Sequence, residues 1–111
     1  MAALFIDSGA LRTELSLQSV TTTDDGFGGF NEEWTELATV FGHIEPLAAD
    51  SRFGAGQTLE TVTHRITLRH RPDVTSGMRF SRQSRVFEIV TVHDPDETGR
   101  YLVCRVRETG A

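Results

Sequence analysis

The stretch TVTHRITLRHR, residues 61–71, has the clearest two-residue period in the chain. One set of alternate positions holds Val62, Ile66 and Leu68, and the other set holds only threonines and arginines. Because successive side chains of a β-strand point to opposite faces, this alternation predicts a strand with one face on a core.

The same period recurs along most of the chain. Strands are predicted at residues 14–23, 35–47, 78–82, 85–93 and 100–108, with turns rich in Gly, Asp or Pro between them. In the second of these, Val40, Gly42 and Ile44 share an inner face and Phe41 and His43 the outer one. Six or seven short strands and no convincing amphipathic helix predict a mainly β protein, a small antiparallel barrel or sandwich. A long loop without pattern separates its second and third strands.

The segment DDGFGGF, residues 24–30, could be a phosphate-binding loop, a metal site or a turn. A dinucleotide fingerprint needs a third glycine where Asn31 stands and a helix after it, whereas the next residues predict a strand. A P-loop needs a lysine, and the chain has none. Glycines between two alternating runs supply the positive φ angles of a hairpin, so we expect a tight turn here.

Size and charge limit the architecture. The 111 residues allow one domain with a modest core. The apolar residues 2–6 are too short for a spanning helix and lack a basic flank. Residues 1–50 carry nine acidic residues and one arginine, and residues 51–111 carry seven acidic residues and ten arginines. Either these halves neutralise each other within one fold, or the acidic flank of one copy pairs with the basic flank of another.

Candidate catalytic and metal sites are weak. Cys104 alternates in phase with Leu102 and Val106, which predicts a core thiol. His64 and His70 are roughly 20 Å apart along an extended strand, too far to share a metal. Residues 94–99, DPDETG, begin like a calcium loop, but Arg105 stands where its last ligand should be. We therefore expect no enzyme, no metal and no cofactor.

The order of these segments resembles the head-tail joining proteins of tailed bacteriophages, also called head-closure, stopper or connector proteins. The resemblance runs from about Gly9 to Arg107. It is carried by the order and spacing of the following positions: Gly9, Leu11, Arg12, Asp25, Gly28, Gly29, Trp34, Pro46, His64, Arg65, Ile66, Arg69, Met78, Arg79, Phe87, Ile89, Asp94, Tyr101, Leu102 and Cys104. The chain departs from the family at Thr13 and Glu14, where basic residues are common, and at Phe41 and Gly42, where an aromatic-alanine pair is common.

The resemblance implies a single head-tail joining domain over residues 1–111, with residues 1–12 as a possible N-terminal arm. It implies a structural protein of the virion neck, made in the host cytoplasm and forming a ring, commonly of twelve copies, without membrane association. Its expected partners are further copies of itself, the portal or adaptor (head completion) protein, the tail terminator or other tail proteins, and the packaged double-stranded DNA. Such a ring retains DNA and gives the tail a docking platform. The lysine-free composition suits a GC-rich genome, and so a prophage or a gene transfer agent.

The resemblance also assigns candidate sites. In related stoppers the loop between the second and third strands projects into the channel, which here makes the candidate gating residues Asp50, Ser51, Arg52, Phe53, Gly54 and Gly56. The candidate contacts between subunits or rings are Glu32, Glu33, Glu36, Arg65 and Arg69. Two alternatives remain open, a neighbouring neck component such as a tail terminator, and a nucleic-acid-binding barrel of the OB type that uses Phe80, Phe87 and Tyr101.

Overall fold

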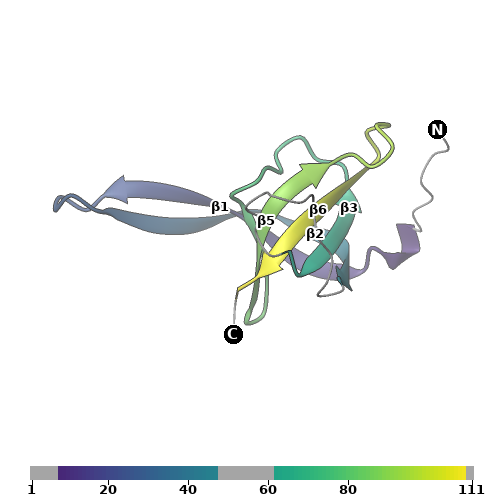
Figure 1. Cartoon of the computed structure of the whole chain (residues 1–111), viewed down its shortest axis with the longest axis horizontal. Coiled ribbons are helices and arrows are strands. Elements are labelled where there is room, and N and C mark those ends of the chain that lie inside the picture. Colours follow the sequence, from purple (N-terminus) through teal and green to yellow (C-terminus); the bar gives the residue numbers. More distant parts are fainter. Residues whose placement is uncertain (1–7, 48–61, 110–111) are drawn as a thin grey trace, which may run out of the picture.

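The computed structural model describes residues 8–47 and 62–109. A short 3-10 turn, η1 (Ser8–Ala10), precedes six strands. The strands are β1 (Thr13–Asp24), β2 (Phe30–Pro46), β3 (His64–Arg69), β4 (Arg79–Arg82), β5 (Arg85–His93) and β6 (Tyr101–Glu108). The predicted mainly β class is confirmed, with strands at each predicted position (Figure 1).

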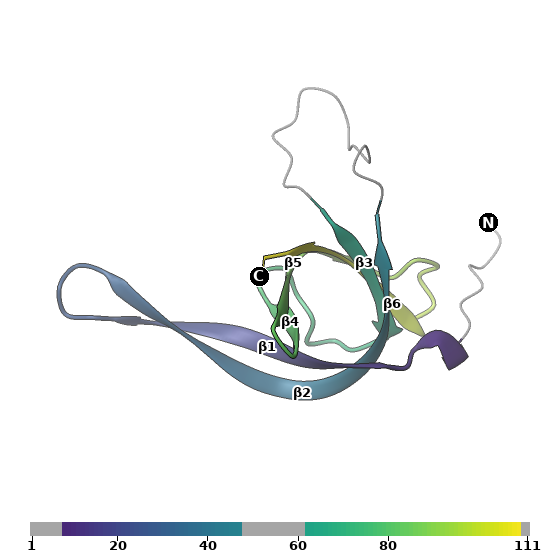
Figure 2. The same cartoon turned by 90° about the horizontal axis from the view of Figure 1, so that it is seen from below.

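All six strands pair antiparallel in one closed barrel with the order β1-β2-β3-β6-β5-β4. The ring is visible in Figure 2. Closure depends on a short seam, because β4 pairs with β1 only over Ser16 to Gln18. The β4–β5 hairpin turns through Gln83 and Ser84, and Gln83 takes a φ of 55°. Within the barrel, closing the sheet removes the free strand edges that otherwise promote aggregation.

The core lies inside the barrel and is built from the inward positions that the alternation predicts. Its largest fully buried side chains are Phe80, Phe87, Leu15, Leu17, Ile66, Leu68, Val106 and Cys104. Gly42 is also buried, and a Cβ at that position would lie 3.0 Å from the carbonyl oxygen of Thr67. The glycine therefore lets β2 and β3 pack closely. Burial raises the pKa of the Cys104 thiol to about 12.

The hairpin of β1 and β2 leaves the barrel. Residues 19–24 and 30–35 pair only with each other, whereas β4 contacts β1 no further than Gln18, and β3 pairs with β2 only from Gly42 onward. We call residues 19–35 the projecting hairpin, which extends to one side of the barrel in Figures 1 and 2. The molecule is correspondingly elongated, with extents of 54 × 36 × 26 Å.

A bulge marks the point where the projecting hairpin begins. Leu17 pairs with Ala38 and Gln18 pairs with Glu36, so Leu37 has no partner across the ladder. An extra residue in one strand bends it and increases its twist. The bulge thus turns the two strands away from the barrel wall.

Candidate functional site

The tip of the projecting hairpin is a turn fixed by two aspartates. The carboxylate oxygen Asp25 Oδ1 accepts hydrogen bonds from the backbone N–H of Phe27, at 2.8 Å, and of Gly29, at 3.1 Å. Asp24 Oδ1 accepts one from the N–H of Gly26 at 2.8 Å. Gly26 and Gly28 have φ angles of 82° and 84°, which glycine adopts without steric cost. The predicted turn is confirmed.

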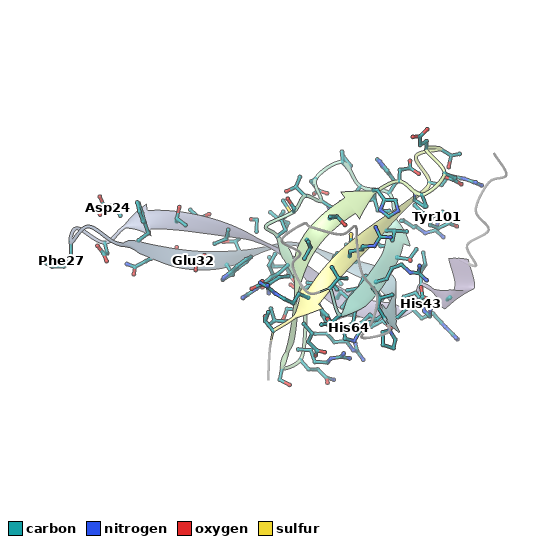
Figure 3. All side chains as sticks on the ribbon, in the orientation of Figure 1. Asp24, Phe27, Glu32, His43, His64 and Tyr101 are labelled. Atoms are coloured by element: carbon teal, nitrogen blue, oxygen red, sulfur yellow. The ribbon has the colours of Figure 1, made fainter. Side chains whose placement is uncertain are left out.

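This turn presents aromatic side chains to solvent. Phe27 is 94 % exposed at the extreme end, and Phe30, at the start of β2, is 72 % exposed. Figure 3 shows Phe27 beyond Asp24 at the end of the molecule. Single exposed hydrophobic residues are common on protein surfaces. Two phenylalanines on a structured tip outside the core instead indicate an interaction site.

The two faces of the projecting hairpin differ in chemistry. One face carries Val20, Trp34, Phe30 and the carboxylate of Glu32, as their cross-strand partners show. The opposite face consists of polar residues, namely Ser19, Thr21, Thr23, Asn31, Glu33 and Thr35. The projecting hairpin is therefore apolar and acidic on one face and polar on the other.

Arg79 of β4 holds the base of the projecting hairpin. Its guanidinium carbon lies 4.0 Å from the centroid of the Trp34 ring, and its Nε donates a hydrogen bond of 2.6 Å to Gln18 Oε1. A guanidinium over an indole face is attracted to the ring quadrupole, and planar stacking favours arginine over lysine. An isolated hairpin is only marginally stable in water, so this contact helps to set its direction.

A shallow hollow of about 370 Å³ lies elsewhere on the barrel. Its lining consists of Leu11, Thr39, Val40, Phe41, Leu68, Arg69, His70 and Arg71. Phe41 is 51 % exposed, as the predicted outward position requires. Arg71 forms a two-pronged pair with Asp73, with both N···O distances 2.9 Å, and this pair lowers the pKa of the Asp73 carboxyl. We call this lining the basic hollow.

The structure separates the five candidate contact residues. Glu32, Glu33 and Glu36 are exposed on β2, within or at the base of the projecting hairpin. Arg65 lies on the barrel wall, where its Nη2 is 2.9 Å from Glu45 Oε2 and lowers the pKa of that carboxyl. Arg69 is exposed beside the basic hollow. Acidic and basic candidates thus lie on different parts of the surface, and whether they meet between copies stays a prediction.

The candidate gating residues Asp50, Ser51, Arg52, Phe53, Gly54 and Gly56 lie outside the described residues, so the gate stays a prediction. Sequence reasoning did not single out Phe27 or Phe30 as contacts, nor the pairing of Arg79 with Trp34. A signal for the first two was present, because phenylalanines flank a glycine-rich turn where no core position is expected. The basic hollow has no such signal, since its residues come from three separate segments.

The described part of the chain gives little support to metal binding, to base stacking or to a membrane-spanning helix. No group of three or more His, Cys, Asp or Glu within residues 8–47 and 62–109 could hold a metal ion. Phe80 and Phe87 are fully buried and so cannot stack on bases, which removes two of the three aromatics of the OB-type alternative. None of the helices that the structure describes has the length and apolar character needed to cross a membrane.

Several solved structures resemble this chain, and two of them show how far the similarity extends. One is a chain from the virion of a native gene transfer agent particle, with 26 % identity, a TM-score of 0.69, and coverage of 91 % of this chain and 97 % of that chain. The other is the solution structure of a Shigella flexneri 2a protein, with 25 % identity, a TM-score of 0.65, and coverage of 91 % and 96 %. A search of curated protein sequences gives no match.

The sequence model that describes phage head completion proteins matches residues 6–109. This match spans both strands of the projecting hairpin and the whole described barrel. The chain therefore belongs to the phage head completion protein family.

Proposed function

We propose that this protein is the subunit of a ring that completes the filled head at its DNA-exit vertex, retains the packaged DNA and offers the tail a docking platform. The observation that carries the proposal is the family match over residues 6–109, together with the similarity to a chain of a gene transfer agent virion over 91 % of this chain. Its neighbours would be further copies of itself, the portal or adaptor protein and tail proteins.

The surface suits assembly better than catalysis. The interior of the barrel is filled by side chains such as Phe80 and Phe87. Among the described residues, the large exposed apolar side chains lie on the projecting hairpin, at its base and in the lining of the basic hollow. Contacts that are weak singly become strong when a symmetric platform presents many of them together. A protein of this kind can remain dispersed until the head offers such a platform.

The net charge agrees with a channel through which DNA slides. At a formal charge of −5 the subunit gains little from phosphate neutralisation, which supplies most nonspecific DNA affinity. Several arginines are also occupied by carboxylates, as in Arg85 with Glu108 and Arg107 with Glu88. Purified protein should therefore not form a stable complex with double-stranded DNA at physiological salt.

Deletion of the gene tests the proposal. Heads that package DNA, then lose it and lie apart from complete tails in electron micrographs, are the expected result. Nuclease-protected DNA should fall in the deletion strain and return when the gene is supplied in trans. Normal tailed particles, or the absence of heads altogether, would contradict the proposed place in assembly.

A further inference from the structure

We propose that the projecting hairpin of one copy docks, Phe27 foremost, into the basic hollow of the next copy. Successive copies would then join in one direction, hairpin to hollow. This inference rests on the proposed function insofar as it requires several copies in one particle. It adds the two surfaces that meet and the chemistry that makes them complementary.

Aromatic side chains on both surfaces provide the apolar part of the contact between the projecting hairpin and the basic hollow. Phe27 and Phe30 are largely exposed on the projecting hairpin, and Phe41 is half exposed on the rim of the basic hollow. The buried side chains of Leu11 and Leu68 form part of the floor. Aromatic residues placed in a pocket carry much of the free energy of many protein interfaces.

The charges on the two surfaces have opposite sign. The projecting hairpin and its base carry Asp24, Asp25, Glu32, Glu33 and Glu36. Within the described residues none of these five carboxylates makes an ion pair. Residues 13–51 contain no arginine or lysine. The nearby arginines, Arg107 beside Glu32 and Arg82 beside Glu36, lie at the base, so the tip with Asp24 and Asp25 is the negatively charged end.

Two exposed arginines lie at or next to the basic hollow. Arg69 is exposed on its rim, and Arg12 is exposed next to Leu11. Neither guanidinium has a hydrogen-bonding or ionic side-chain partner in the part of the chain that the structure describes. Opposite potentials on two surfaces steer their encounter and fix their register.

The placement of the two surfaces excludes contact within one copy. The projecting hairpin extends from one side of the barrel, and η1, which leads directly into Leu11, lies at the opposite side in Figures 1 and 2. A contact between two different patches is heterologous, and it repeats from copy to copy, as a ring where the rotation closes and as an open filament where it does not. The geometry therefore fits a repeating assembly, such as the proposed ring, better than an isolated dimer.

A second hollow is a poorer partner for the same tip. It lies at the base of the projecting hairpin, and its lining includes Trp34, Met78, Ser76, Glu32, Glu88 and Arg107. Arg107 is paired with Glu88, and the carboxylate of Glu32 would repel the aspartates of an incoming tip. The basic hollow has no carboxylate in its lining, although Asp73 pairs with its Arg71.

Cysteine cross-linking in assembled particles tests the contact. The double variant Phe27→Cys/Phe41→Cys places one thiol on each proposed surface, and the native Cys104 is buried. Mild oxidation should give a ladder of linked multimers up to the complete ring, because each copy carries both halves of the contact. Each single variant should give no species beyond a dimer.

The matched control is Phe27→Cys/Ser76→Cys, which moves the second thiol to the other hollow. This pair should give no ladder. A ladder from it, a cross-link from Phe27→Cys to a different virion protein, or no ladder from the first pair in particles that contain the variant, would overturn the proposal. The deletion strain tests the proposed role in head completion independently of this cross-link. Normal tailed particles in that strain would contradict the role itself.

Charge reversal, introduced into the Phe27→Cys/Phe41→Cys variant, tests whether opposite charges contribute to the contact. Arg69→Glu should abolish the ladder, because it places a carboxylate opposite the acidic tip. Arg82→Glu makes the same charge change on β4, where the arginine donates a hydrogen bond to the Glu14 carbonyl oxygen, and it should leave the ladder intact. Equal cross-linking in both variants would overturn the role assigned to Arg69.

Discussion

The guanidinium carbon of Arg79 lies 4.0 Å from the centre of the Trp34 ring and joins β4 of the barrel to the projecting hairpin. The same side chain donates a hydrogen bond to Gln18 of β1, the residue just before the projecting hairpin begins. One residue therefore fixes both strands where they leave the barrel. The projecting hairpin has no third strand beside it, so its direction depends on this contact and on the bulge opposite Leu17 and Gln18.

Removing this contact should loosen the projecting hairpin and leave the barrel folded. In a double-mutant cycle of Arg79→Gln and Trp34→Leu, the coupling free energy should be about 0.5–1 kcal/mol, the range for a partly exposed cation–π pair. Urea unfolding of the four proteins measures it. Additive effects of the two substitutions would show that the stacking contributes nothing.

The turn at the tip should depend on Asp25. In Asp25→Ala the N–H groups of Phe27 and Gly29 lose their shared acceptor, so amide hydrogen exchange should become faster in residues 24–30. Exchange in β5 and β6 should stay unchanged, because those strands do not contact the tip. Asn31→Ala, on the adjacent exposed strand, serves as the control. Equal exchange at the tip in Asp25→Ala and the parent protein would contradict this role.

Cys104 should be inert in the folded protein. Burial raises its pKa to about 12, so the thiolate is scarce at neutral pH, and the barrel also shields the sulfur. A thiol-specific reagent should label the protein only after denaturation. Ser76→Cys, on an exposed turn, should be labelled at once without denaturant. Rapid labelling of native Cys104 would mean that the barrel opens readily.

The Arg85–Glu108 pair should contribute to the acid sensitivity of the fold. The hydrogen bonds from Arg85 lower the pKa of the Glu108 carboxyl from its ordinary value of 4.5, despite the opposing effect of desolvation. A carboxyl group with a lowered folded pKa adds stability above its unfolded pKa, and this stability is lost as the pH falls through the folded pKa.

Glu108→Gln should therefore reduce the free energy of unfolding at neutral pH by at most about 1 kcal/mol, since the pair is partly exposed. The variant should also lose less stability than the parent protein on acidification below about pH 4. Urea unfolding over a pH series measures both effects. Glu97→Gln, whose carboxylate makes no ion pair among the described residues, is the control. Parallel pH profiles of parent and Glu108→Gln would contradict the assignment.

The strands and the mainly β class could be predicted from the sequence because the strands bury one face, whereas the choice between barrel and sandwich could not. Phe87 and Ile89 alternate within residues 85–93, and the observed strand β5 has the same bounds, Arg85–His93. The projection of the β1–β2 hairpin could not be predicted in this way. The alternation within β1 and β2 does not show where their pairing with β4 and β3 ends. The lengths of β3 and β4, which lie far away in the chain, determine that point.

Strand length was the available signal. The strands predicted at residues 14–23 and 35–47 already exceed the roughly five or six residues of an ordinary strand, and the observed β1 and β2 are longer still, with 12 and 17 residues. The segment from Thr21 to Thr23 and its partner Asn31 to Glu33 offer no apolar face to a core. Together these features indicate a ribbon in solvent. The basic hollow is different, since Leu11, Phe41 and Arg69 come together only through the closed ring of strands.

The most direct test of the account is a cryo-electron microscopy reconstruction of the head-tail junction in intact particles. We predict a ring of copies of this barrel between the head vertex and the tail, with each projecting hairpin on the basic hollow of a neighbour. A reconstruction that places the barrel on the tail tube, or nowhere at the junction, would contradict the assignment to head completion.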